Sequence, residues 1–475
     1  MKKYILKYGM LAVLSTAALA SCSDDFIDTE FYQQVQQGPL NTIEELESFV
    51  KGQYVSMRNA SYYGCDFLMI GEVRSNNMYS DFANGAGYYQ TVASYSMTAG
   101  DQYSSGPYMN MYQAIAKANI VINNVPTGQL TWKSSQDPAV IQARANYLKG
   151  QAYASRALAL FDLLRMFGQE YSGGTTGVVI PVTYNPQAKQ ARSTVAETRA
   201  QIEADFDKAL ALMGTPSSNV HTIRTEINQY GVKALMSRYY LYKGDYTKVK
   251  SLVADIVASG KYAVISASDF SSSFSKPNSA ANSIFEIAVG STNDLGTTSI
   301  ANKLNVAPNG YGNMKVLPAL RNSYVADDVR KDVITPANVL NGKYVNSFDN
   351  IHLVRYEEVL LNGAEAEIKA GNPTIAVGYF NQIQAKRGKG TAGTLPLVTS
   401  VTEDMIYTER QKELVGEGFG YWDLLRRSQS ITQRNANGVD GTVRSIGNQL
   451  LTFPIPRAEI NVPGTLVTPN PGFGN

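Results

Sequence analysis

The stretch that decides the fold is residues 226–259, which read EINQYGVKALMSRYYLYKGDYTKVKSLVADIVAS. It predicts two helices, Glu226–Lys243 and Tyr246–Ser259, joined only by Gly244-Asp245. So short a turn forces the two helices to pack side by side in opposite directions. Small and apolar residues recur at the spacing of a tetratricopeptide-like pair, at Ser237, Tyr240, Gly244, Tyr246, Val249, Val253 and Ile256.

Residues 351–386 repeat this register further along the chain. Two predicted helices, Ile351–Ala370 and Thr374–Lys386, meet at a turn that begins with Gly371. The same offsets carry Ala364, Glu367, Gly371, Pro373, Ala376, Phe380 and Ile383. Small residues let paired helices approach closely, and each pair needs a neighbour to bury its outer face. Further pairs are therefore expected.

Two more helix pairs are predicted, near residues 41–125 and 138–213. Their helical patterns are Asn41–Arg58, Tyr108–Val125, Pro138–Phe167 and Thr194–Met213. The predicted fold class is therefore mainly α, with about four tetratricopeptide-like helical hairpins that form a curved scaffold.

Long loop-rich insertions interrupt the hairpins at residues 62–102 and 260–350. The first is polar and rich in aromatic residues, with little helical pattern. The second is rich in Ser, Asn and Gly, with a short strand predicted at Ser283–Val289. The last long helix is predicted at Glu403–Ser428. We interpret residues 41–475 as a single helical domain.

The N-terminus carries the pattern of an export signal over residues 1–21. Three lysines precede a short apolar run from Met10 to Ala20, which is too short to span a bilayer. The junction Leu19-Ala20-Ser21-Cys22 matches a bacterial lipoprotein cleavage box. We therefore predict that the thiol of Cys22 is acylated and that residues 22–40 form a lipidated leader. The alternative is an ordinary signal followed by an incidental cysteine. The second cysteine of the chain, Cys65, is expected to be buried as a small apolar residue.

The composition narrows the function classes. Of 475 residues, 44% are apolar and 17% are charged, which is typical of a folded chain and not of a disordered one. The three lysines of residues 1–21 take the formal charge from +2 to −1 in the mature chain, which leaves no basic field to bind nucleic acid. The 30 tyrosines, against 2 tryptophans, suit wet recognition surfaces and helix packing alike.

Catalytic motifs are missing from the sequence, which holds no phosphate loop, GxSxG, HExxH or CxxC pattern. Glu409, Glu413 and Glu417 recur every four residues, a spacing that could serve acid–base chemistry on sugars. The alternative is ion pairing with Arg355, Arg410, Arg426 or Arg427. We interpret the three carboxylates as structural and the chain as not an enzyme. Trp422, in an apolar helical stripe, is interpreted as a core residue and not as a stacking platform.

No cofactor or resident metal is predicted. His221 and His352 stand 131 positions apart, with no acidic residues at metal-ligand spacing. Asp101 and Asp327-Asp328 could hold a structural calcium ion, although their spacing is not a calcium signature.

The candidate ligand-binding residues lie in the first insertion and near residue 311. Sugar recognition needs flat rings against the CH face of a pyranose, and side chains that make forked hydrogen bonds to adjacent hydroxyls. Both kinds occur at Arg74, Asn76, Asn77, Tyr79, Asp81, Tyr88 and Tyr89, with Tyr311 as a second candidate. The alternative is an ordinary, well-hydrogen-bonded surface loop.

Several segments share the pattern of a known family. They are Cys22–Asp28, Arg144–Gly168 with Val179–Val182, Leu353–Ala366, Glu409–Arg427, Phe453–Pro456 and Glu459-Ile460. On these segments the chain resembles the SusD/RagB outer-membrane lipoproteins of Bacteroidetes over nearly its whole length. It departs from their pattern at residues 461–463 and 469–473, and at Phe419, where the family often has a basic residue. These departures affect the scaffold more than any binding site.

The resemblance implies a mostly helical fold with four tetratricopeptide pairs. It also implies a place on the outer cell surface, as a lid over a SusC-like TonB-dependent outer-membrane transporter. The cargo in this family is usually a glycan, and a peptide in the RagB branch. The family loop that corresponds to residues 72–89 often contributes to the cargo site.

The predicted function is non-catalytic binding of nutrient oligosaccharides and their delivery to such a transporter. A second possibility is peptide binding for the same kind of transporter. A third is a surface glycoside hydrolase, which would release sugars, and a fourth is a scaffold that binds only protein.

Overall fold

The computed structural model describes residues 38–277, 279–306, 310–390 and 393–473. The chain from Leu40 to its C-terminus forms one compact unit. The predicted signal (residues 1–21), the predicted acylation site Cys22 and nearly all of the predicted leader (residues 22–40) lie outside the described residues. No helix among the described residues is long and apolar enough to cross a membrane.

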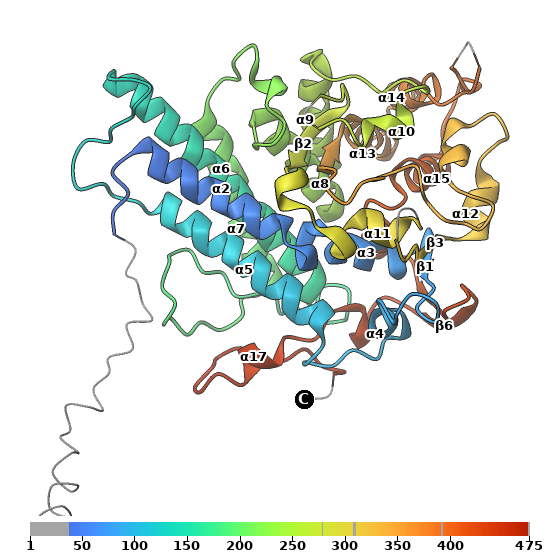
Figure 1. Ribbon diagram of the computed structural model, residues 1–475, viewed down its shortest axis with the longest axis horizontal. Helices are drawn as coiled ribbons and strands as arrows, with labels where there is room; N and C mark the ends of the chain where they lie inside the picture. Colours follow the sequence, from blue (N-terminus) through green and yellow to red (C-terminus); the bar gives the residue numbers. More distant parts are fainter. Residues whose placement is uncertain (1–37, 278, 307–309, 391–392, 474–475) are drawn as a thin grey trace, which may run out of the picture. The chain divides into compact units, whose positions relative to one another are not determined.

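The prediction of a mainly helical fold built on four helix pairs is confirmed (Figure 1). The first two pairs are α2 (Ile43–Arg58) with α5 (Gln102–Ile122) and α6 (Pro138–Phe167) with α7 (Val195–Met213). The later two are α8 (Gln229–Lys243) with α9 (Tyr246–Ala258) and α13 (Tyr356–Lys369) with α14 (Pro373–Gln384). Helix α5 also packs on α6, α7 on α8, and α9 on α13, so each pair finds the neighbour that its outer face requires.

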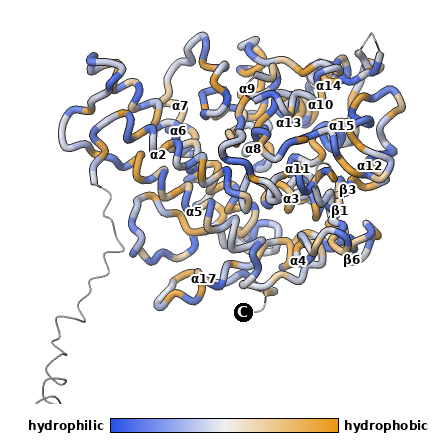
Figure 2. The backbone as a smooth tube through the Cα atoms, in the orientation of Figure 1, coloured by the Kyte–Doolittle hydropathy of each residue, from blue (hydrophilic) through white to orange (hydrophobic). Residues whose placement is uncertain are grey.

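Local chemistry explains where these helices begin and end. Thr42 and Thr194 each form a capping box with the glutamate three residues later, which satisfies free amide groups of the first turn. Asp137 caps α6, and Pro138 occupies its first position, where a missing N–H costs nothing. Gly244 adopts a left-handed backbone (φ +81°), which lets the chain reverse directly into α9. Hydrophobic and hydrophilic residues are mixed along the helices (Figure 2). In α2 the buried residues Ile43, Leu46, Val50 and Met57 recur at helical spacing, so they share one face.

The start of the predicted helix Ile351–Ala370 differs from the prediction. Ile351–Arg355, predicted as the first turn of a helix, is strand β4. It pairs antiparallel with β2 (Ser283–Ile287), the strand predicted at Ser283–Val289. Every residue of both strands is buried, so the apolar run shows no alternation that would separate a strand from a helix.

The predicted last helix, Glu403–Ser428, is two helices. Helix α15 (Glu403–Leu414) ends before α16 (Gly420–Arg426) begins. Gly416 and Gly418 adopt positive φ angles of +81° and +83° between them. A Cβ atom at Gly418 would stand 2.8 Å from the Cα atom of Leu68, so the break lets the chain lie directly against α3 (Asp66–Val73).

The first insertion is more ordered than its sequence suggested. It holds the π-type turn η2 (Ala60–Gly64), α3, β1 (Met78–Ser80) and α4 (Gln90–Ser94). Helix α3 escaped prediction because nearly all its residues are buried, which erases the amphipathic period.

Short elements make up the remaining loops. The chain between α7 and β4 holds η3 (Val220–Thr222), α10 (Phe270–Ser273), η4 (Ser291–Asn293), η5 (Gly296–Thr298), α11 (Ile300–Leu304), β3 (Met314–Val316), α12 (Pro318–Ser323) and η6 (Val329–Val333). The C-terminal part holds β5 (Ile431–Arg434), β6 (Asp440–Arg444), η7 (Gln449–Leu451) and α17 (Arg457–Ile460). Strand β1 pairs antiparallel with β3, which joins the two long insertions.

Candidate functional site

The joined insertions bring together two of the predicted tyrosines. The pairing of β1 with β3 continues beyond the strands, where the amide of Asp81 donates to the carbonyl of Asn313 over 2.7 Å. Tyr88 lies after β1 in the chain and Tyr311 lies before β3, so both stand beyond the same end of this strand pair. Their ring centroids lie 5.0 Å apart, with the ring planes at 62°. Tyr311 is 41% exposed, so its ring meets solvent.

A buried lysine lies against this pair of rings. The ammonium nitrogen of Lys303, on α11, is 3.3 Å from the ring centroid of Tyr88 and 4.8 Å from that of Tyr311. It donates to the carbonyl of Thr297 over 2.9 Å, and burial lowers its pKa. A cation against aromatic faces holds their orientation, so the exposed ring is a rigid platform.

A cavity of about 400 Å³ opens beside Tyr88. Its lining residues are Ala86, Gly87, Tyr88, Gln90, Thr91, Asp101, Gln102 and Tyr103. Asp101 caps α5 by accepting from the amide of Tyr103 over 2.8 Å. Amide and carboxylate groups beside aromatic rings are the combination that sugar hydroxyls and CH faces require. We call this cavity, together with the Tyr88–Tyr311 pair, the tyrosine site.

Three further candidates do not line the cavity. Tyr79 is half-buried and packs on Gly438, where an added Cβ atom would stand 2.8 Å from its ring. The carboxylate of Asp81 accepts from the side-chain amide of Asn84 over 3.0 Å. The side-chain oxygen of Asn76 accepts from Arg434 over 3.1 Å.

The remaining three candidates are buried. Arg74 donates to the carbonyls of Val92 and Leu450 over 3.0 and 3.3 Å, and its guanidinium lies 4.0 Å from the ring centroid of Tyr95. The side-chain oxygen of Asn77 accepts from Gln411 over 3.0 Å.

Tyr89 is fully buried and donates to the carboxylate of Asp66 over 2.8 Å. Its backbone adopts a left-handed conformation (φ +61°) at the start of α4. Such a conformation is uncommon for a tyrosine and is held by the surrounding packing. Arg74, Asn77 and Tyr89 therefore fix the loop, and none of the three offers an exposed surface to a ligand.

Lys303 and Gln102 were missed in the sequence. Lys303 stands in a short run without a motif, and Gln102 lies at the first position of a helix that was predicted to start six residues later. Lys303 has no local signal, because its place beside Tyr88 comes from contact between distant segments. Gln102 lines a cavity formed within residues 86–103, and it was missed because the start of α5 was predicted too late.

The acidic residues considered for acid–base chemistry are engaged in a buried ion network. Glu413 accepts from Arg330, Arg355 and Arg387 over 2.8–3.0 Å. Glu417 pairs with Arg355 and Lys343, and Glu409 with Arg330. Burial alone would raise the pKa of Glu413, but the three guanidinium groups hold it well below its usual range. Apart from Arg355, the partners in these ion pairs differ from the predicted ones.

The other predicted residues take structural places. Trp422 is fully buried and stacks on Phe67 at a centroid distance of 5.9 Å, as expected for a core residue. Cys65 is a buried free thiol, and burial raises its pKa to about 12. Asp328 pairs with Arg330, far along the chain from the cap at Asp101. Within the described residues, no group of three or more His, Cys, Asp and Glu side chains could hold a metal ion.

Comparisons with known proteins place this fold and site in context. A family model described as "Starch-binding associating with outer membrane" matches residues 25–241, and the model of the SusD family matches residues 337–473. The SusD-like protein P38 of Formosa agariphila is 22% identical over 98% of this chain and 100% of its own length.

Solved structures agree with these matches. A SusD superfamily protein of Bacteroides thetaiotaomicron superposes with a TM-score of 0.77 and 26% identity, over 90% of this chain and all of its own. The surface glycan-binding protein A of Bacteroides fluxus superposes with a TM-score of 0.69, over 91% of this chain and 99% of its own. Its 19% identity shows a shared fold alone.

Proposed function

The chain belongs to the SusD family, whose members are non-catalytic binding proteins, and on that premise we propose that it binds nutrient oligosaccharides at the cell surface. The observation that carries this proposal is the exposed ring of Tyr311, held against Tyr88 and Lys303 beside a polar cavity. The family description, which names starch binding, supports a carbohydrate as the ligand.

The tyrosine site suits a sugar for two physical reasons. The exposed ring of Tyr311 offers a flat apolar face for the CH groups of a pyranose. Gln90, Gln102 and the carboxylate of Asp101 can exchange hydrogen bonds with its hydroxyls. Asn76, Tyr79 and Asp81 stay predicted ligand contacts outside the lining of the cavity. Each contact is weak in water, so we expect modest affinity that grows with the number of sugar units.

We further propose that the protein works at the outer membrane with a SusC-like TonB-dependent transporter as its partner. The family description supports this location, since it states an association with the outer membrane. Acylation of Cys22 would tether the chain there, because several acyl chains together give durable attachment. The tagged native protein is purified from solubilised outer membranes to test the partnership. We expect a barrel transporter to co-purify, and a preparation without any such transporter would contradict the partnership.

A binding screen tests the ligand class. The chain without residues 1–22 is run through affinity gels that contain different polysaccharides, and is titrated with peptide mixtures in parallel. We expect retardation by at least one glycan and no binding to peptides. Binding to peptides alone would replace the glycan with the RagB-like alternative. The recovered glycan is then sized by chromatography, and any shortening would refute non-catalytic binding.

A further inference from the structure

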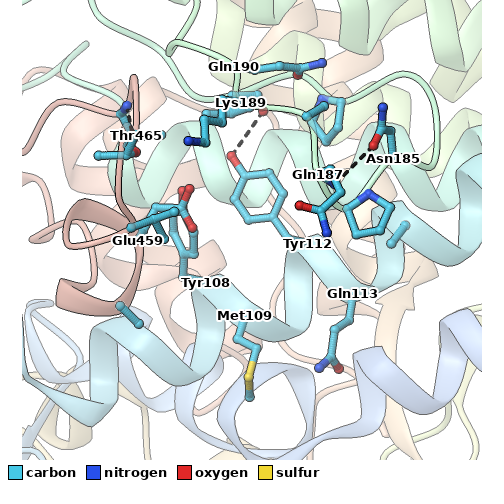
Figure 3. A pocket seen from close by; sticks show the side chains of 18 of the residues that line it. Tyr108, Met109, Tyr112, Gln113, Asn185, Gln187, Lys189, Gln190, Glu459 and Thr465 are labelled. Atoms are coloured by element: carbon cyan, nitrogen blue, oxygen red, sulfur yellow. Dashed lines mark hydrogen bonds between the residues drawn. The ribbon is translucent and has the colours of Figure 1, made fainter. Parts of the chain in front are cut away.

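A second and larger cavity, about 630 Å³ in volume, lies apart from the tyrosine site. Figure 3 shows that three segments far apart in the sequence surround it: α5, the loop of residues 179–190, and the C-terminal segment of residues 456–467. Its volume falls within the range of roughly 300–1,000 Å³ that is usual for small-molecule sites. We call this cavity the α5 cleft.

The walls of the α5 cleft are tied to one another before any ligand arrives. The hydroxyl of Tyr112, labelled in Figure 3, donates to the carbonyl of Val179 over 3.1 Å. The ammonium group of Lys189 donates to the carbonyl of Pro463 over 2.6 Å, and Arg192 donates to that of Thr468 over 3.0 Å. A preformed site loses little conformational entropy on binding, so little of the free energy of its contacts with the ligand is lost to ordering the protein.

The chemistry of the lining matches an uncharged, hydroxyl-rich ligand with apolar faces. The ring centroids of Tyr108 and Tyr112 lie 4.6 Å apart, and the side chain of Tyr184, which also lines the cleft, is 44% exposed. The side-chain amides of Gln113 and Gln187 also reach the cleft (Figure 3). Aromatic rings can stack on the apolar faces of a pyranose, and amides can exchange hydrogen bonds with its hydroxyl groups.

The charges in the α5 cleft point to the same class of ligand. Among the described residues that line it, only Lys189 and Glu459 are charged, so they leave the cleft with no net charge. No ion pair between described residues involves Glu459, and burial raises its pKa. A carboxylate without a cationic partner can accept hydrogen bonds from two adjacent hydroxyls.

One face of α5 connects this cleft to the tyrosine site. Gln102 lines the tyrosine site, whereas Ser105, Met109 and Gln113 line the α5 cleft. These residues stand at positions i, i+3, i+7 and i+11 of α5, so they share one side of the helix. All four are exposed or half-exposed, and the stripe spans about 16 Å at 1.5 Å per residue.

From this arrangement we propose that the α5 cleft is a second binding site for an uncharged oligosaccharide, and that one chain lies along α5 and occupies both sites. This inference rests on the proposed glycan-binding function and extends it to a ligand long enough to bridge the two cavities. A bridged ligand gains affinity because the second contact is intramolecular. Short oligosaccharides, which reach one site only, gain nothing from the second.

Blocking the α5 cleft tests the inference. Ala188 is exposed and lines the cleft, so Ala188→Trp fills it. Ala139 is also exposed, near the start of α6 and outside the lining of both sites, and Ala139→Trp is the matched control. Gln187→Ala is a second, milder variant that removes an amide without adding bulk. Each is titrated calorimetrically with malto-, cello- and xylo-oligosaccharides from disaccharide to octasaccharide.

We expect Ala188→Trp to lower the affinity for the longest oligosaccharide at least about tenfold and to leave the affinity for short ones unchanged. The gain of affinity with chain length should therefore disappear. Gln187→Ala should act in the same direction by a smaller factor, and Ala139→Trp should match the native protein. If the native protein binds an oligosaccharide and both cleft variants bind each length as tightly as the native protein does, the second site is refuted. If the native protein binds no oligosaccharide, the proposed function itself fails.

Discussion

Replacing Glu413 by glutamine tests whether the acidic residues of α15 serve structure. The side chain is fully buried and accepts four hydrogen bonds of 2.8–3.0 Å from the three guanidinium groups of Arg330, Arg355 and Arg387. Glu413→Gln keeps the volume but removes the charge. It also turns one oxygen into an NH₂ group that faces other N–H donors.

The expected loss follows from burial. Removing one member of a buried ion pair costs about 3–5 kcal/mol, because the partner charges stay in a medium of low polarity without compensation. Glu403, on the same helix, is 39% exposed and pairs with Lys369. An exposed pair contributes about 0–1 kcal/mol, so Glu403→Gln is the matched control.

Urea unfolding of the native chain and both variants measures these differences. We expect the free energy of unfolding to fall by about 3–5 kcal/mol in Glu413→Gln and by at most about 1 kcal/mol in Glu403→Gln. The guanidinium groups hold the pKa of Glu413 well below its usual value, so its stabilisation is present above the unfolded pKa and disappears as the pH falls through the folded one. A loss below about 1 kcal/mol for Glu413→Gln at neutral pH would refute the structural role.

Three further predictions concern the core and the anchor. Burial raises the pKa of Glu72 to about 7, above its unfolded value, so the stability of the fold should decrease as the pH rises from about 4.5 to about 7. Thermal unfolding measured across this pH range should show the decrease in the native protein and not in Glu72→Gln. Trp422→Ala should lower the free energy of unfolding by about 3–5 kcal/mol in urea, and an unchanged midpoint would contradict its place in the core. Cys22→Ser should move the protein from the membrane to the soluble fraction of cells, and retention at the membrane would exclude a lipid anchor on this thiol.

The helices that could be predicted from the sequence are those with one buried face and clear end signals. Helix α6 begins and ends where predicted, because Asp137 and Pro138 mark its start and Gly168 its end. Elements that are buried on all sides show no periodic pattern of apolar and polar residues. For this reason α3 was missed and β4 was predicted as helix. The break between α15 and α16 was not expected because it depends on the positive φ angles of Gly416 and Gly418, which a helical period does not reveal.

The binding site could be predicted only in part. The composition of the first insertion indicates recognition chemistry, but burial decides which side chains are available to a ligand. Tyr88 and Tyr311 meet because β1 pairs with β3, a contact between segments more than two hundred residues apart. Single-sequence patterns describe local periods and not such pairings, and Lys303 enters the site for the same reason.

The most direct test of the central claim is a calorimetric titration of Tyr311 variants with the glycan found in the screen. Tyr311→Ala removes the exposed ring, whereas Tyr311→Phe keeps its face and loses only the hydroxyl. We expect the alanine variant to bind about tenfold or more weakly, a loss of about 1.4 kcal/mol, and the phenylalanine variant to bind nearly as well as the native protein. Equal affinity of the alanine variant and the native protein would show that the glycan binds elsewhere, and would contradict the account of this site.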